Sequence, residues 1–161
     1  VISNMPPVDS SSIVCVTGAG GYVGGWIVKV LLEKGYRVHG CVRDSACARN
    51  DFLRHMTGYS TGMLTLFSCD VSKVGGLDEA LSGCNALIHA AADADTPLER
   101  RPAQYTCSSQ HIIDSVGRTK SVSRVVYTSS AAAIMGDTDL RELRRRPSID
   151  ETRYPHPSAP N

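Results

Sequence analysis

The sequence predicts an α/β fold with a doubly wound parallel sheet of about five strands and helices on both faces. Three observations predict it. Short apolar runs alternate with helical patterns, the runs are almost continuously apolar, as in Ile13–Val16 and Ala86–Ala92, and the first connection is rich in glycine. Parallel strands need long crossover connections, and strands buried on both faces lack the alternation of a half-exposed strand. A chain of 161 residues is long enough for one such domain.

Apolar runs place the expected strands. They are Ser12–Thr17, Arg37–Val42, Leu64–Ser68, Ala86–Ala90 and Arg124–Ser129. Apolar residues at helical spacing predict a helix between the first two strands, and Gly35 supplies its stop. Those residues are Val23, Trp26, Ile27, Val30 and Leu31. The other helices are expected around Phe52, Leu53 and Met56, over Leu77–Leu81, and after Pro102, with Ile112, Ile113 and Val116 late in the last of them.

Composition and charge exclude several classes of partner. The formal net charge is +1 and the pI is about 7.8, so no bulk attraction to nucleic acid or to an acidic membrane is expected. No apolar run approaches the roughly 20 residues that a membrane-spanning helix needs. The sequence therefore predicts no nucleic-acid partner and no membrane partner.

The six cysteines include no C-x-x-C pair. Disulfide frameworks and zinc sites need tighter, patterned spacing, so no metal site is predicted. Cys15, Cys41, Cys69 and Cys84 lie in or beside apolar runs, which indicates buried free thiols in a reducing, cytoplasmic compartment. A redox-sensing thiol is the alternative.

The stretch TGAGGYVG places Gly18, Gly21 and Gly24 at the spacing G-x-x-G-x-x-G after the first expected strand. The first glycine permits a tight turn, the second lets the backbone approach a pyrophosphate, and the third lets helix and strand pack closely. The helix that begins near Tyr22 presents N–H groups and the positive end of its dipole to the phosphates. The pattern predicts a Rossmann-type dinucleotide site with strand order 3-2-1-4-5. A purely structural glycine turn is the alternative.

The end of the second expected strand indicates which dinucleotide binds. An acidic residue there would bond the adenosine ribose and favour NAD(H), whereas the CVRD stretch places Arg43 first. A guanidinium pairs bidentately with a 2′-phosphate and stacks on adenine, and Arg49 follows within reach. NADP(H) is therefore favoured over NAD(H), and Asp44 keeps NAD(H) open. Asp70, after the third strand, is placed to accept a bond from the adenine amino group, with a loop-capping role as the alternative.

Together these stretches resemble the extended short-chain dehydrogenase/reductase family. The similar segments are VTGAGGYVGGWIVKVLLEKGYRVHGCVRD, CDV, ALIHAAA and RVVYTSSAAAIMG. Within the family the sequence looks most like the dihydroflavonol 4-reductase and cinnamoyl-CoA reductase group, which shares VRD after the second strand and a DE patch similar to Ile149–Thr152. The resemblance covers roughly Ile13 to Thr152. It implies an NADP-dependent oxidoreductase that acts on a small-molecule carbonyl substrate.

The resemblance also implies roles for individual residues. The backbone at Tyr22 and Val23 would hold the pyrophosphate, and Arg43 would hold the 2′-phosphate. Ser130 is the serine expected to polarise the substrate carbonyl, with Ser129 as the fallback and a serine that caps its own turn as the alternative. The further residues expected to line the cofactor are Asp70, Val71, His89, Ala90, Ala91, Ala92, Thr128 and Ser129.

The tyrosine and lysine that the family's chemistry needs, spaced Y-x-x-x-K, are absent, because none of the six tyrosines has a lysine four places on. In the family the lysine lowers the tyrosine pKa, so that a phenol acts as an acid near neutral pH. The expectation is the N-terminal part of a longer enzyme. Its parts are a flexible leader at 1–11, a dinucleotide-binding domain at 12–134 and a polar loop or insertion at 135–161, with the C-terminal substrate domain absent from this chain.

Two other functions stay open. A nucleotide-sugar epimerase or dehydratase shares the fold and the SSA strand end but usually retains NAD, so Arg43 argues against it. A non-catalytic NAD(P)-binding module, which senses redox state or serves as an interaction surface, is favoured by the missing tyrosine and lysine if the chain ends at Asn161. The resemblance further implies dimers that use two helices of the sheet, one of them after Pro102, so a homodimer is one of the oligomeric states left open.

Overall fold

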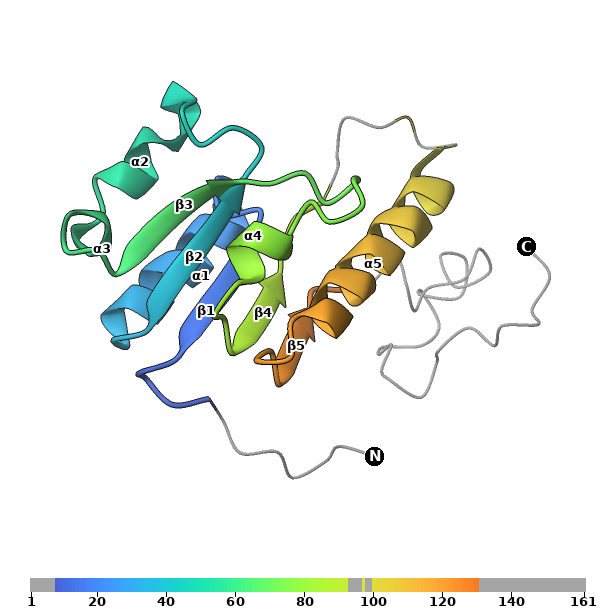
Figure 1. Ribbon diagram of the computed structural model, residues 1–161. Helices are drawn as coiled ribbons and strands as arrows, with labels where there is room; N and C mark the ends of the chain where they lie inside the picture. Colours follow the sequence, from blue (N-terminus) through green and yellow to red (C-terminus); the bar gives the residue numbers. More distant parts are fainter. Residues whose placement is uncertain (1–7, 93–96, 98–99, 131–161) are drawn as a thin grey trace, which may run out of the picture. The chain divides into compact units, whose positions relative to one another are not determined.

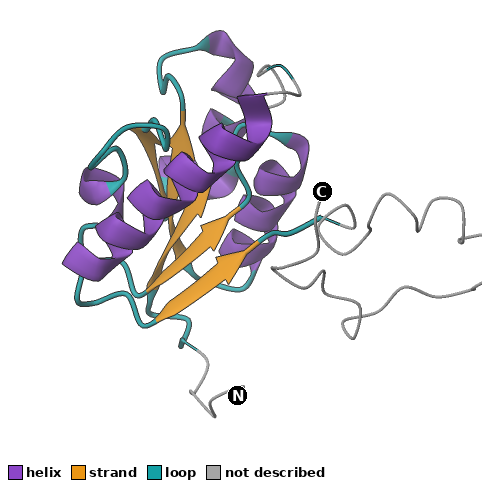
Figure 2. Cartoon of the chain, turned by 90° about the vertical axis from the view of Figure 1, so that its right-hand side faces the viewer, coloured by secondary structure: helices purple, strands orange, loops and turns teal. Residues whose placement is uncertain are grey.

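A computed structural model describes residues 8–92, 97 and 100–130 of the chain (Figures 1 and 2). It divides the chain into two units, Val1–Tyr127 and Thr128–Asn161. The described part of the second unit consists of three exposed residues, Thr128, Ser129 and Ser130. The expected polar segment at 135–161 lies outside the described residues, as does most of the expected leader.

The first unit contains a five-stranded parallel sheet in the order β3-β2-β1-β4-β5, which confirms the predicted fold class and strand order (Figure 1). The strands are β1 (Ile13–Thr17), β2 (Arg37–Val42), β3 (Leu64–Ser68), β4 (Ala86–His89) and β5 (Arg124–Tyr127). In the centre of the sheet Cys15 of β1 lies opposite His39 of β2 and Leu87 of β4.

Three predicted strand ends were wrong by one or two residues, each for a local reason. Ser12 precedes β1 because its N–H bonds to the carbonyl of Asp9 in a turn. Ala90 follows β4, where its N–H is shared between the carbonyl and the hydroxyl of Thr17. β5 ends at Tyr127 because its neighbour β4 ends at the paired position, His89.

Helices cover both faces of the sheet (Figures 1 and 2). Their bounds are α1 (Tyr22–Glu33), the 3-10 helix η1 (Ala48–Asn50), α2 (Asp51–Arg54), α3 (Thr57–Ser60), α4 (Asp78–Leu81) and α5 (Arg101–Arg118). The end of α1 at Gly35 is confirmed: Gly35 has a φ of +84°, and the N–H of Tyr36 bonds back to the carbonyl of Leu31.

Two helix predictions need correction. The single helix expected around Phe52, Leu53 and Met56 is split into α2 and α3, because Met56 has an extended backbone with a ψ of 138°. The last helix starts before Pro102 rather than after it. Proline is tolerated in this first turn, since its missing N–H would have no partner within the helix.

Side chains alternate between the two faces of the sheet and build two separate cores. The core beneath α1 contains Val14, Val16, Ala19, Val28, Val38, Val42, Leu53, Leu64 and Ala86. The core beneath α4 and α5 contains Cys15, Cys41, Cys69, Leu77, Ala80, Leu81, Cys84, Leu87 and Ile112. The prediction of buried thiols is thus confirmed for the four cysteines beside apolar runs.

The thiols in this second core are close to one another. The Sγ atoms of Cys15 and Cys41 lie 3.5 Å apart, and Cys84 donates to the carbonyl of Ala80 at 3.2 Å. The contacts with Cys15 and Cys69, together with burial, raise the pKa of Cys41 well above its usual value. Cys41 therefore stays protonated near neutral pH and packs as a small apolar side chain.

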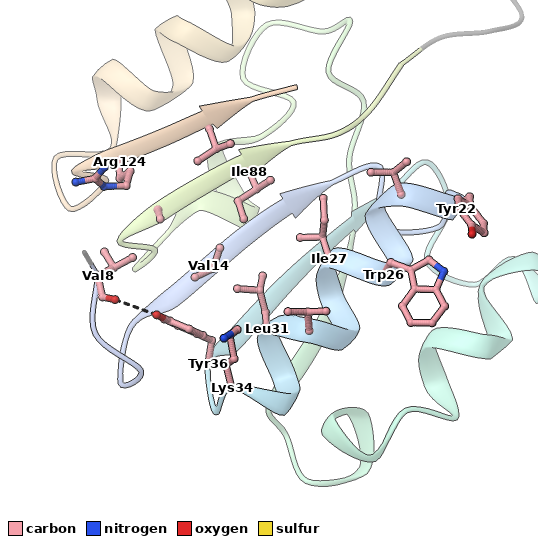
Figure 3. A pocket seen from close by; sticks show the side chains of 14 residues that line it. Val8, Val14, Tyr22, Trp26, Ile27, Leu31, Lys34, Tyr36, Ile88 and Arg124 are labelled. Carbon is pink, nitrogen blue, oxygen red and sulfur yellow. Dashed lines mark hydrogen bonds between the residues drawn. The ribbon is translucent and has the colours of Figure 1, made fainter. Parts of the chain in front are cut away.

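One side of α1, together with the neighbouring sheet face, forms an apolar surface that the described residues leave open (Figure 3). Val23, Trp26 and Val30 are 56%, 53% and 42% exposed. A hollow of about 700 Å³ lies between these side chains and the sheet face that carries Ile88 and Val126. The apolar stripe predicted for this helix is therefore only partly buried, because α1 packs against β1 and β2 and leaves the faces of β4 and β5 uncovered.

Candidate functional site

The candidate site lies where the strands of the sheet end. All five strands are parallel, so their carboxyl ends share one edge, and the strand order reverses between β1 and β4. Open α/β sheets bind ligands in the crevice at such a reversal. Gly18 follows β1 at this point, Arg43 follows β2 and Ala90 follows β4.

The glycine loop folds tightly against its surroundings. Gly18 has a φ of +70°, and a Cβ there would lie 2.8 Å from both N and Cα of Ala91. A Cβ on Gly24 would overlap the carbonyl oxygen of Gly18. The loop is also held to β2, because the N–H of Ala19 bonds to the carbonyl of Cys41 at 3.1 Å. Two of the three motif glycines are thus required by close backbone contacts.

The N-terminus of α1 faces solvent at the end of this loop. Gly21 is the N-cap residue, no acidic side chain lies in the first turn, and Tyr22 and Val23 are exposed. The first N–H groups of a helix have no partner within it, and the helix dipole places partial positive charge there. This arrangement, predicted from the sequence, suits the phosphates of a dinucleotide.

The loop after β2 carries both candidate 2′-phosphate ligands. Arg43 and Arg49 are exposed, as is Asp44 between them. The Asp44 carboxylate accepts a bond from the N–H of Ala46 at 2.9 Å, so one of its oxygens is already engaged in its own turn. The loop is joined to β3 by a bond of 2.9 Å from the N–H of Ser45 to the hydroxyl of Ser68.

Asp70 caps its own loop after β3. Its carboxylate accepts bonds from the N–H of Ser72 at 3.0 Å and from the Ser72 hydroxyl at 2.6 Å, and Lys73 lies 3.5 Å away. The Ser72 hydroxyl is the main cause that lowers the pKa of Asp70. The loop-capping alternative describes these contacts, and the contact with adenine stays a prediction. Val71 is half-buried beside the second core.

A buried threonine organises the end of β4. The Thr17 hydroxyl accepts bonds from the N–H groups of Ala90 at 3.2 Å and Ala91 at 3.3 Å, and it lies 2.7 Å from Nδ1 of His89. Because the hydroxyl already accepts two bonds, its own proton goes to His89, which makes this imidazole neutral. Burial lowers the pKa of His89 in the same direction. Thr17 thereby fixes the backbone that is expected to line the nicotinamide ribose, of which Ala92 is exposed.

Tyr127, the last residue of β5, joins the sheet to α5. Its hydroxyl lies 2.9 Å from the Ser109 hydroxyl, and its ring lies 4.5 Å from the His89 ring. The predicted residues Thr128, Ser129 and Ser130 follow directly in the chain. The choice between the two serines stays a prediction.

Comparison with known proteins identifies the family. The family described as NAD dependent epimerase/dehydratase matches residues 14–160. The chain belongs to this family. It is 36% identical over 150 residues to cinnamoyl-CoA reductase 1 of Petunia hybrida, covering 92% of the chain and 43% of that protein. It is 34% identical over 137 residues to dihydroflavonol 4-reductase of Gerbera hybrida, covering 80% and 36%.

A solved structure agrees with the sequence relatives. Yeast methylglyoxal/isovaleraldehyde reductase Gre2, complexed with NADPH, superposes with a TM-score of 0.66 at 26% identity, covering 76% of the chain and 38% of Gre2. The chain thus spans about two fifths of the length of the curated relatives it matches.

Three residues of the site were missed by sequence reasoning. Thr17 looks like the end of an apolar strand in the sequence, and its partners at and just after the end of β4 come 72 to 74 residues later. Asn50 and Arg54 read as ordinary polar residues near a short helix, yet both bond to carbonyls of the Arg43–Arg49 loop. No local signal singled out any of the three: Asn50, for example, is one of two polar residues, Asn50 and Asp51, that precede Phe52.

In the part of the chain that the structure describes, no group of three or more His, Cys, Asp or Glu side chains could hold a metal ion. Among the same residues, no helix has the length and apolar character that a membrane crossing requires.

Proposed function

We propose that the chain is the cofactor-binding part of an NADP-dependent oxidoreductase that reduces a small-molecule carbonyl, of the cinnamoyl-CoA reductase and dihydroflavonol 4-reductase kind. The likeness to those reductases and to an NADPH-bound reductase supports the proposal. The nicotinamide would supply a hydride to the carbonyl carbon when the cofactor is bound. The chain's own contribution is to hold that cofactor.

The loop after β2 carries the proposed preference for NADP(H). Arg43 and Arg49 are exposed at the carboxyl end of the sheet, while Asp44, which would favour NAD(H), bonds to its own turn. Guanidinium groups form strong charge-assisted bonds with phosphate. Gly18, Gly21 and the first turn of α1 would hold the pyrophosphate, as the glycine contacts support.

Substrate activation belongs to the proposal as well. The hydroxyl of Ser130, or of Ser129 in its place, would polarise the carbonyl. The sequence contains no Y-x-x-x-K pair. We therefore propose that carbonyl reduction needs a longer protein, of the length of the cinnamoyl-CoA reductase relative. The six free cysteines support a reducing compartment, and we propose the cytoplasm.

Isothermal titration calorimetry with NADP⁺ and NAD⁺ tests the proposal on the chain itself. NADP⁺ is expected to bind about 10- to 100-fold more tightly, because hydrogen bonds to a charged group contribute about 1.5–3 kcal/mol each. Equal affinities, or tighter binding of NAD⁺, would support the epimerase or dehydratase alternative. If the chain bound neither NADP⁺ nor NAD⁺, the proposed function would be refuted.

A further inference from the structure

We infer that Asn50 is a positioning residue that couples the glycine loop to the loop carrying Arg43 and Arg49, and so sets the preference for a 2′-phosphorylated dinucleotide. The inference rests on the proposed function and extends it to a residue that is not expected to touch the cofactor. Two observations support it: Asn50 is buried, and its side chain contacts both the arginine loop and the glycine loop.

Asn50 holds the arginine loop from within. Its side chain is buried, with only 6% of the residue exposed, and Nδ2 donates to the carbonyl of Asp44 at 2.8 Å. The same carbonyl accepts the N–H of Cys47 at 3.3 Å, and the N–H of Asn50 bonds to the carbonyl of Cys47 at 3.0 Å. The amide thus closes the turn that immediately follows Arg43.

In the other direction Asn50 contacts the glycine loop. A Cβ on Gly20 would overlap Oδ1 of Asn50 and would lie 3.3 Å from Cγ1 of Val42. Gly20 is not one of the three spaced glycines, so the phosphate-binding pattern does not explain it. The Asn50 amide offers a reason for it, because the amide oxygen lies where a Cβ at position 20 would be and would have to move.

Arg54 supports the same loop from α2. Its guanidinium donates to the carbonyls of Ser45 and Cys47 and pairs with Asp51 on its own helix. Three carbonyls of the loop, those of Asp44, Ser45 and Cys47, therefore bond to the side chains of Asn50 and Arg54. Arg43 and Arg49 remain exposed on a loop whose backbone is fixed from inside.

Loss of the Asn50 amide should weaken the recognition of the 2′-phosphate selectively. The Asp44 carbonyl would lose its side-chain donor, and the loop would lose its contact with Gly20. Phosphate recognition by guanidinium groups depends on their geometry, whereas the pyrophosphate contacts belong to the glycine loop and the first turn of α1. We therefore expect the affinity for NADP⁺ to fall by about tenfold and the affinity for NAD⁺ to change by less than about threefold.

The test is calorimetric titration of NADP⁺ and NAD⁺ into the wild-type chain and its variants. Asn50→Ala removes the amide. Asn85→Ala is the matched control, because Oδ1 of Asn85 accepts the N–H of Ile13 at 3.1 Å, at the amino end of the strands and away from the arginine loop. Circular dichroism verifies that each variant is folded. The expected result is a lower NADP⁺ to NAD⁺ affinity ratio for Asn50→Ala and a wild-type ratio for Asn85→Ala.

A double-mutant cycle provides a second measurement that does not depend on the Asn50→Ala variant alone. Gly20→Ala should push the amide away in the wild-type background and lower the affinity ratio. It should cost less in the Asn50→Ala background, where the amide no longer occupies the space. Should Asn50→Ala not fold, Gly20→Ala decides by itself: a lowered ratio supports the coupling and an unchanged ratio overturns it.

The outcomes separate this inference from the function on which it rests. A wild-type chain that prefers NADP⁺, with the same preference in Asn50→Ala and Gly20→Ala, would overturn the role of Asn50 and leave the proposed function intact. A wild-type chain without preference for NADP⁺ would overturn both. An equal fall of the ratio in Asn50→Ala and Asn85→Ala would reduce Asn50 to a general contributor to stability.

Discussion

Replacement of Thr17 by valine should destabilise the fold through a single hydroxyl. Valine matches threonine in shape, so packing in the centre of the sheet is retained. The hydroxyl, however, accepts the N–H groups of Ala90 and Ala91 and lies 2.7 Å from Nδ1 of His89. The N–H of Ala90 keeps a bond of 3.3 Å to the Thr17 carbonyl. Two partly or fully buried groups, the N–H of Ala91 and Nδ1 of His89, therefore lose this partner.

The magnitude follows from these two groups. A buried polar group left without its bond costs about 1–3 kcal/mol, and burying the additional methyl group returns roughly 0.8 kcal/mol. For two such groups the free energy of unfolding should fall by about 1–5 kcal/mol, with a middle value of about 3 kcal/mol. With a urea dependence of about 2 kcal/mol/M, the midpoint of urea unfolding should move down by about 1.5 M.

Urea unfolding followed by circular dichroism measures this shift, and Thr17→Ser is the matched control. Serine keeps the hydroxyl and removes one methyl group, so it should cost about 1 kcal/mol. The reasoning is refuted if Thr17→Val is as stable as wild type, or if Thr17→Ser is the less stable of the two variants.

Three further predictions concern the same edge of the sheet. Gly24→Ala should abolish dinucleotide binding in calorimetry, because its Cβ would overlap the Gly18 carbonyl, whereas Gly117→Ala on α5 meets no atom within 4 Å and should bind as wild type. Arg43→Ala should lower the NADP⁺ to NAD⁺ affinity ratio by about tenfold, and Arg37→Ala, at the opposite end of β2, should leave it unchanged; similar losses in both would point to bulk charge. The free energy of unfolding should fall as the pH drops below about 6.5 and through the lowered folded-state pKa of His89, because the unfolded chain binds the proton more readily; a His89→Gln variant with the same pH dependence would exclude His89 as the cause.

Local sequence patterns were sufficient to predict the sheet and the glycine loop. β1 and β4 are almost continuous apolar runs, the other strands are short runs that are mainly apolar, and the order 3-2-1-4-5 follows once the glycine loop marks the first βαβ unit. The end of α1 was predictable because a glycine with positive φ closes it. By contrast, the break between α2 and α3 depends on the extended backbone at Met56, which no periodic pattern reveals.

The places of the candidate cofactor residues at the strand ends were predictable, but the side chains that hold their loops in place were not. Gly18 and Arg43 were found because each follows a strand at the edge where ligands bind. Thr17, Asn50 and Arg54 act through backbone groups of other segments, and any polar residue at these positions would have produced the same sequence pattern. Asp70 shows the same limit, since the sequence allowed both a ligand contact and a loop cap, and the bonds to Ser72 are those of a cap.

The residues proposed to bind the cofactor and those proposed to activate the substrate lie in different parts of the chain. The residues proposed to hold the phosphates lie between Gly18 and Arg49, on loops that hydrogen-bond to β2 through the Cys41 carbonyl and to β3 through the Ser68 hydroxyl. The residues proposed to act on the carbonyl begin only after β5, with Ser129 and Ser130. Cofactor binding and its 2′-phosphate preference can therefore be measured on this chain independently of turnover. A chain that binds NADP⁺ selectively but reduces no carbonyl would agree with both the reductase proposal and the sequence, which lacks the Y-x-x-x-K pair.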